Sequence, residues 1–173
     1  IILPVVVEHK LAQFLGYLNG DGCLEQERVA IFEQDKQVAL QYKETFDQYF
    51  QLDSSYIFRE SKNYHQLRFT SRPLVRLIQN EFPEIKKTLD TTIPEKMLKS
   101  PNEVVASFLK GLFDAEGYVS GNRIGLGMNN KELVQQVQMV LLRFSIISSM
   151  QEYDNRANKY SKNPRFTIEI SEK

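Results

Sequence analysis

Two carboxylates hold equivalent positions in an internal repeat of this 173-residue chain. Asp21 lies in the segment 14–22, FLGYLNGDG, and Glu116 lies 95 residues later in the segment 109–117, LKGLFDAEG. Two carboxylates brought close together repel each other unless they are protonated or bridged by a hard cation, and oxygen-only ligands favour Mg²⁺ or Ca²⁺ over zinc. The chemistry that this pair predicts is metal-assisted hydrolysis of a phosphodiester.

Two amphipathic helices must position these acids. Apolar residues spaced i, i+3, i+4 and i+7 over 11–18 and over 105–113 predict one helix before each acid. Ser100 as N-cap, Pro101 as the first helical residue and Glu103 in a capping box predict where the second helix starts. Small residues four apart on one face of each helix let two backbones approach closely. This predicted helix interface consists of Gly16, Gly20, Gly111 and Ala115.

Each helix is followed by the same pattern of elements. Hairpins are predicted over 23–32 and 118–124, and second helices begin after the caps Asp35 and Asn130. Strand pairs follow at 55–59 with 66–70 and at 150–153 with 165–170. A last helix, over 74–82, is predicted only in the first copy, so we expect that the given sequence lacks the last helix of the second copy. The predicted domains are a first repeat, 1–90, a linker, 91–101, with a short helical turn after Pro94, and an incomplete second repeat, 102–173.

The basic residues are clustered although the chain carries 22 basic and 22 acidic residues. A net charge of zero argues mildly against a nucleic-acid partner. The segments 56–72 and 154–165, however, each hold four basic residues and one acid, at corresponding places of the two copies. Either segment alone would be interpreted as a solvated surface, and their recurrence favours a binding role. The candidate DNA-binding residues are Arg28, Arg59, Lys62, Arg68, Arg72, Arg123, Arg156, Lys159 and Arg165.

Composition excludes several classes of protein. With 42% hydrophobic residues, 8 Tyr and 11 Phe, the chain is globular rather than disordered or low in complexity. No apolar run is long enough to span a bilayer, so no membrane partner is expected. The single cysteine, Cys23, cannot form an internal disulfide, and two histidines do not make a zinc cluster. We therefore expect an intracellular location, in the cytoplasm, nucleoid or an organelle matrix.

The segments 15–22 and 109–117 resemble the two signature motifs of a LAGLIDADG homing endonuclease of the monomeric, two-motif type. The stretch 93–114 is similar to endonuclease domains inside inteins, and intein, intron and free-standing origins all stay open. The resemblance implies an α+β fold, a pseudo-twofold duplicated αββαββα unit with saddle-shaped antiparallel sheets. It implies a monomer that cleaves both strands of double-stranded DNA at a site of about 20 base pairs with divalent metal.

The resemblance also implies roles for particular residues. It implies that Asp21 and Glu116 bind the metal ion, with Gly20 and Ala115 at the same metal site. The implied ion is Mg²⁺, and Ca²⁺ can replace it in DNA binding without supporting cleavage. Asn19 departs from the acid that is common at the sixth motif position, whereas Asp114 retains it. Two further sets are implied by position. The polar residues expected to hold water near the metals, counted as catalytic, are Gln34 and Asn129. The candidates for a basic active-site residue are Arg68, Arg72 and Arg165.

Two other functions stay open. One is a LAGLIDADG-type protein that binds without cutting, as a DNA-binding regulator or an RNA maturase. The other is a structural or protein-interaction module, which only the zero net charge favours. Both nucleic-acid functions predict affinity that falls with salt at a logarithmic slope of about 0.9 per phosphate contact, and the module does not.

Overall fold

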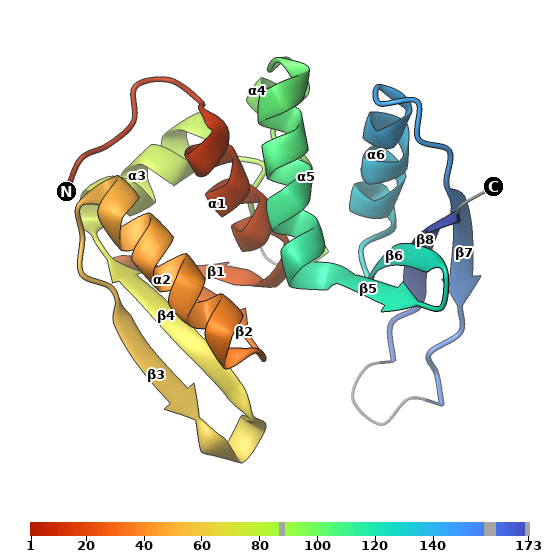
Figure 1. The fold of residues 1–173 in the computed structure, drawn as a ribbon, viewed down its shortest axis with the longest axis horizontal. Helices are drawn as coiled ribbons and strands as arrows, with labels where there is room; N and C mark the ends of the chain where they lie inside the picture. Colours follow the sequence, from red (N-terminus) through yellow and green to blue (C-terminus); the bar gives the residue numbers. More distant parts are fainter. Residues whose placement is uncertain (87–88, 158–161, 172–173) are drawn as a thin grey trace.

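Two halves of the same topology flank a central pair of helices, α1 (His9–Asp21) and α5 (Asn102–Glu116), which lie side by side in Figure 1. The structure, a computed structural model, describes residues 1–86, 89–157 and 162–171. The elements of the first half after α1 are β1 (Gly22–Leu24), β2 (Arg28–Glu33), α2 (Lys36–Phe50), β3 (Ser55–Arg59), the 3₁₀ turn η1 (Glu60–Lys62), β4 (Tyr64–Thr70) and α3 (Arg72–Glu81). Those from the connection onward are α4 (Glu95–Leu98), α5, β5 (Gly117–Ser120), β6 (Arg123–Met128), α6 (Lys131–Leu142), β7 (Ser149–Tyr153) and β8 (Arg165–Ser171).

Each half contains one four-stranded antiparallel sheet with the same strand order. The first sheet runs β1-β2-β4-β3 and the second β5-β6-β8-β7. The registers also correspond, because Glu33 pairs with His65 in the first sheet and Met128 pairs with Phe166 in the second. Residues 95 apart in β2 and β6 are therefore equivalent, as are residues 101 apart in β4 and β8. This gives each side chain near the central helices an identifiable counterpart in the other half.

The second helix of each half, α2 and α6, starts after the N-cap residue that the sequence predicts, whereas α5 does not. The carboxylate of Asp35 accepts from the backbone N–H groups of Gln37 and Val38, and the side chain of Asn130 accepts from that of Leu133, which confirms both predicted caps. The predicted capping box of α5 is wrong. Pro101, with φ −55° and ψ 154°, is the N-cap residue and makes no side-chain cap bond, while the Ser100 hydroxyl donates to the Lys96 carbonyl at 2.8 Å. The end of α4 therefore uses the hydroxyl that the prediction assigned to α5.

The connection between the halves is packed into the molecule. Thr91, Ile93 and Met97 are buried, and the short helix predicted after Pro94 is present as α4. The amide of Asn19, at the end of α1, donates to the Thr92 carbonyl at 3.0 Å and accepts from the Thr91 hydroxyl. On the other side of the connection, Asn130 donates to the Thr91 carbonyl at 2.7 Å. The segment 91–93 thus ties α1 to the start of α6.

The helices cover one face of each sheet, and the opposite face, here called the outer face, carries no helix among the described residues. Val29 and Leu67 of the first sheet, and Leu126 and Ile168 of the second, are in the hydrophobic core beneath the helices. Their neighbours along the strands therefore point to the outer face, since side chains alternate along a strand. In the described chain no helix spans a membrane by length and hydropathy.

The two halves differ in how well their sheets are covered. α3 contacts β2, and Val29 of that strand is 0% exposed. The residue equivalent to Val29 in the second sheet is Ile124, which is 52% exposed, and its neighbour Val119 is 77% exposed. Among the described residues no helix follows β8, so this end of the second sheet presents apolar side chains at the surface.

Candidate active site

The central helices meet backbone to backbone. A Cβ added at Gly16 would lie 2.0 Å from the carbonyl oxygen of Phe108, and one at Gly111 would lie 2.0 Å from that of Gln13. Since no Cβ tolerates such a distance, only glycine fits at these two places. Near the helix ends, a Cβ at Gly20 would lie 2.8 Å from the Ala115 Cβ and 3.1 Å from the Glu116 Cγ. All four residues of the predicted interface therefore lie where α1 and α5 touch, and the contact brings the two helix ends together.

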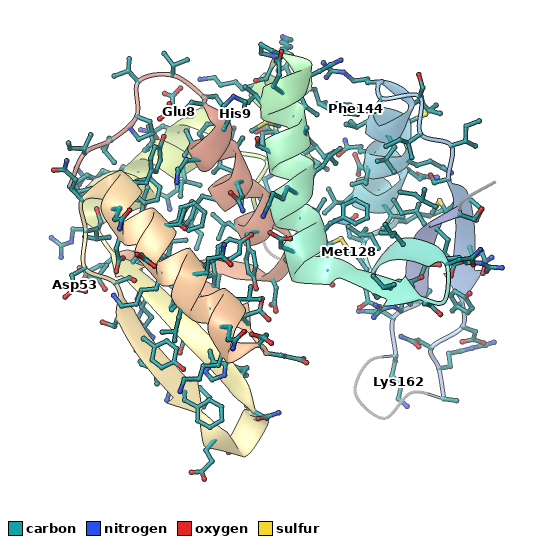
Figure 2. The ribbon with its side chains drawn as sticks, in the orientation of Figure 1. Glu8, His9, Asp53, Met128, Phe144 and Lys162 are labelled. Carbon is teal, nitrogen blue, oxygen red and sulfur yellow. The ribbon has the colours of Figure 1, made fainter. Side chains whose placement is uncertain are left out.

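Asp21 and Glu116 line one cavity of about 230 Å³ at these helix ends. Gly20 from α1 and Asn129 and Arg165 from the second half line the same cavity. Figure 2 shows Met128, another residue of its wall, beside the C-terminal end of α5. Two carboxylates, a guanidinium and the amides of Asn19, Asn129 and Asn130 thus line one small, polar space.

The two acids influence each other electrostatically. Burial, and then the charge of Asp21, raise the pKa of Glu116 to about 7, and Arg165 acts in the opposite direction. Burial, and then the charge of Glu33, raise the pKa of Asp21 to about 6. Glu116 is half-buried and Asp21 keeps an exposed edge, and each carboxylate lies close to another negative charge. A cation placed between them would relieve both effects.

The oxygen atoms available as ligands in the cavity fit a hard divalent cation. They are carboxylate and amide oxygens, which Mg²⁺ and Ca²⁺ prefer. Across residues 1–86, 89–157 and 162–171, no group of three or more His, Cys, Asp and Glu side chains is placed to hold a metal ion. Mg²⁺ commonly binds through one or two carboxylates, with water and substrate phosphate completing its coordination. The site fits a cation that binds together with a phosphate substrate.

Glu33 is a carboxylate near the site that the sequence analysis missed. The Tyr17 hydroxyl donates to Glu33 Oε2 at 2.7 Å, and the backbone N–H groups of Gln34 and Asp35 donate to Oε1 at 2.7 and 2.9 Å. Three donors fix this side chain at the end of β2. The signal was the alternation of β2, which puts Glu33 on the same inward face as the buried Val29 and Ile31.

Arg165 reaches the cavity because β6 has a glycine beneath it. A Cβ added at Gly127 would lie 2.8 Å from Nε and Nη2 of Arg165, so the guanidinium lies directly over this glycine. The sequence carries a signal for this arrangement, since Gly125 and Gly127 alternate in a strand, and a glycine inside a strand often marks a close approach. Of the three basic candidates for the active site, Arg165 is the one that lines the cavity.

The two polar candidates occupy different surroundings. Asn129 lines the cavity and donates to the carbonyls of Asn163 and Pro164, at 3.2 and 2.8 Å. Gln34 is exposed and is not among the residues that line the cavity with Asp21. The structure therefore brings Asn129 to the carboxylates and leaves its first-half counterpart outside.

The basic candidates divide by location. Strand register places Arg28, Arg59 and Arg68 on the outer face of the first sheet and Arg123 and Arg165 on that of the second. Both Arg59 and Arg68 donate to Gln66 Oε1, at 3.3 and 3.1 Å, and form a polar cluster there. Outside the strands, Lys62 lies in η1 and the remaining two form ion pairs, Arg72 with Glu27 and Arg156 with Asp154. Lys159 lies outside the described residues.

Comparison with known proteins supports a shared fold. The family of LAGLIDADG-like domains matches residues 103–172. The structure of I-DmoI in complex with DNA and Mn is similar with a TM-score of 0.67 at 20% identity, over 96% of this chain and 91% of that one. Full-length DUF199/WhiA from Thermatoga maritima is similar with a TM-score of 0.68 at 15% identity, over 99% of this chain and 53% of that one. The chain has the LAGLIDADG fold, which confirms the α+β class expected from the sequence.

Curated relatives by sequence are much longer proteins. Glutamine–fructose-6-phosphate aminotransferase (isomerizing) of Methanocaldococcus jannaschii is 31% identical over 169 residues, which cover 95% of this chain and 15% of that protein. The probable translation initiation factor IF-2 of the same organism is 32% identical over 162 residues, which cover 85% of this chain and 13% of that protein. The chain therefore spans less than a sixth of these two relatives.

Proposed function

We propose that this chain is a site-specific endonuclease that hydrolyses both strands of double-stranded DNA with a divalent metal ion. The observation that carries the proposal is the cavity in which Asp21 and Glu116, from equivalent helix ends, meet between two sheets. A site on the approximate twofold axis of a duplicated protein faces two DNA strands that are themselves related by a twofold axis. That geometry suits a double-strand cut.

The outer faces of the sheets support DNA as the substrate. Arginines stand on both of them, and the Arg59–Gln66–Arg68 cluster offers guanidinium and amide groups of the kind that read base edges in a major groove. Because the net charge of the chain is zero, attraction at long range is weak, and affinity depends on these local contacts. Solved structures of I-DmoI, which shares the fold, contain DNA together with Mn, Mg or Ca.

The chain's own residues divide the chemical work. A bound Mg²⁺ would activate water and stabilise the leaving oxygen. Asp21 and Glu116 would hold the ion, with Gly20 and Ala115 permitting the close approach that this requires. Arg165 would offset negative charge at phosphorus, and Asn129, fixed by two backbone carbonyls, would orient water in the cavity.

Paired selections on one randomised duplex library test this function. The first recovers molecules that the protein cuts in Mg²⁺, and the second recovers molecules that it binds without metal. We expect one long site in both selections, cut only with metal. Recovery by binding alone would replace the proposal with the non-cutting regulator or maturase, and recovery by neither selection would leave the protein-interaction module.

We also propose that the domain acts as a monomer and is of the inserted type, intein- or intron-associated. The support comes from two relatives, one named as an aminotransferase and the other as an initiation factor. Their names share no activity, yet each relative matches this chain over a small part of its own length. Mass spectrometry of the source cells would distinguish the two origins, since only an intein yields precursor peptides that join the domain to a longer host chain. Sedimentation of the purified domain would test the monomer.

A further inference from the structure

One groove beside the central helices is filled by the connection between the halves. The backbone N–H of Ile93 donates to Gln136 Oε1 of α6 at 2.7 Å. The amide of Asn19 in α1 donates to the Thr92 carbonyl at 3.0 Å and accepts from the Thr91 hydroxyl. Both Thr91 and Ile93 are buried. Side-chain amides of α1 and α6 thus hold a segment that belongs to no helix or strand, chiefly through its backbone.

The equivalent groove of the first half is open. Gln41 is the counterpart of Gln136, and Asp114 is the counterpart of Asn19, since residues 95 apart correspond. Both counterparts line a groove of about 460 Å³ that is bounded by α1, α2 and α5. The side chains at the positions that hold the connection in one half therefore face an unfilled space in the other.

The open groove has a more polar lining than the filled one. Three residues of the core beside the filled groove have polar counterparts that line the open groove: Leu15, Val105 and Val137 correspond to Lys110, Lys10 and Tyr42. An apolar wall remains at Val38 and Phe46. A ligand of this groove must therefore offer polar and charged groups together with some apolar surface.

The charges in the open groove follow an order along its length. At the start of α1, Lys10 makes no ion pair with any described residue. In the middle, Lys110 pairs with Asp114 at 2.7 Å. At the opposite end, Glu33 accepts from the Tyr17 hydroxyl and two backbone N–H groups, all uncharged donors. The groove therefore has one positive end and one negative end.

The filled groove gives a direction to any segment that lies in the open one. There the chain runs from Asn19, near the end of α1, to α4, which lies beside the start of α5 in Figure 1. The same path in the first half begins near Asp114 and Glu33 and ends near Lys10 at the start of α1. The amino end of a bound segment thus meets the negative end of the groove.

We propose that this groove binds a short extended segment of a partner protein. The segment carries a basic side chain near its amino end, an apolar side chain in its middle and an acidic side chain near its carboxyl end. The acid pairs with Lys10, the base lies near Glu33, and Gln41 accepts a backbone N–H, as Gln136 does in the other half. Val38 contacts the apolar side chain.

The length of the groove fits a segment of about five residues. Tyr17, which holds Glu33, follows Lys10 by seven residues, or about 10 Å of helix. The side chains that project from both positions lengthen this separation. Five residues of extended chain, at about 3.3 Å each, span it.

The proposed partner site is separate from the catalytic cavity. The open groove shares no lining residue with the cavity of Asp21 and Glu116, and none of the candidate DNA-binding arginines lines it. Its walls are helices, whereas those arginines on the strands point to the outer faces of the sheets. A partner and DNA can therefore bind together, and the inference goes beyond the endonuclease function without depending on it.

Two capped peptides that differ in the order of their charges test the groove. Both are built on the segment 90–95, DTTIPE, which runs through the filled groove. KTTIPE has the expected order of charges, and ETTIPK reverses it. Titration of ¹⁵N-labelled protein, followed by nuclear magnetic resonance, gives the affinity and the residues contacted. KTTIPE should shift the signals of groove residues and bind about tenfold or more tightly than ETTIPK.

Substitutions at exposed positions identify the contacts. Lys10→Glu should weaken KTTIPE about tenfold and restore binding to KTTIPK, which carries a base in place of the acid. Gln41→Leu should weaken KTTIPE about three- to tenfold through the loss of one hydrogen bond. Gln48→Leu is the matched control, because Gln48 is exposed on the same helix and does not line the groove. Thermal melting checks that each variant is folded.

Absence of binding, equal affinity for the two peptides, or signal shifts outside the groove would refute the proposed site. Unchanged affinity in both Lys10→Glu and Gln41→Leu would refute it as well. Sedimentation tests a second copy of the chain as the occupant, since dimers that Gln41→Leu abolishes would overturn the partner segment. Because no assay here depends on cleavage, failure of the endonuclease function would leave this result unaffected.

Discussion

Replacing Gly16 with alanine should destabilise the protein, although alanine favours a helix by about 1 kcal/mol over glycine. The added methyl would lie 2.0 Å from the carbonyl oxygen of Phe108, so α1 and α5 must separate by about 1 Å or more to restore an ordinary contact. Such a gap weakens dispersion contacts along the whole helix pair. Because the obstacle is backbone rather than a flexible side chain, the cost belongs at the upper end of the range for overpacking. We expect a net loss of about 3 kcal/mol.

Thermal and urea unfolding measure this loss. For a domain of this size, about 3 kcal/mol corresponds to a melting temperature lower by about 6–12 °C. Gly111→Ala should act similarly, since its methyl would lie 2.0 Å from the Gln13 carbonyl, and the double variant should lose less than the sum because both changes separate the same helices. Gly121→Ala is the control. That residue has a φ of +61° and no atom within 4 Å of an added Cβ, so only backbone strain of about 1 kcal/mol is expected. Wild-type or greater stability of Gly16→Ala would refute the close helix contact.

Three further substitutions test individual contacts. Tyr42→Phe removes a hydroxyl that accepts from Gln13 and donates to Asp114 across the two halves, and should cost about 1–2 kcal/mol in urea unfolding; no loss would mean that this bond does not join the halves. Thr91→Val removes buried bonds to Asn19 and the Glu84 carbonyl, and should cost about 1–3 kcal/mol by the same assay, whereas an unchanged midpoint would show a connection that is not held in place. Glu116→Gln tests pH dependence: the folded-state pKa of about 7 exceeds the ordinary 4.5, so the wild-type carboxylate destabilises the metal-free fold above pH 7 and this penalty disappears as the pH falls toward 4.5. The variant should therefore exceed the wild type by about 2 kcal/mol at pH ~8 and by nothing at pH ~4, and equal stabilities at both would contradict the raised pKa.

The sequence was sufficient to predict the elements and the carboxylate pair because their signals are local or repeated. Helical spacing before Asp21 and Glu116, and caps such as Asp35 and Asn130, depend on residues within one or two turns. Small residues at Gly16 and Gly111 indicated close packing, because two copies of one helix form an interface that a repeat makes visible.

Features that depend on pairing between distant strands could not be predicted in the same way. Arg165 reaches the cavity only because the register of β8 against β6 sets it over Gly127, and a one-residue shift would move it to the other face. Strand alternation indicates that Glu33 faces inward, but its position near Asp21 depends on a contact with Tyr17 of the central helix, which alternation does not specify. The capping box of α5 failed because Ser100 had two possible partners, and the helix that precedes it took the hydroxyl.

The most direct test of the proposed function compares cleavage and binding of the selected duplex by the wild type, Asp21→Asn and Glu116→Gln. We expect either variant to lose at least about a hundredfold in cleavage rate with Mg²⁺, since even residues that only support a metal ligand contribute about 10- to 100-fold. Affinity for the duplex without metal should stay within about tenfold, because the proposed function assigns the phosphate contacts to the arginines on the outer faces of the sheets. Cleavage at the wild-type rate by either variant would contradict the assignment of this carboxylate pair as the catalytic site.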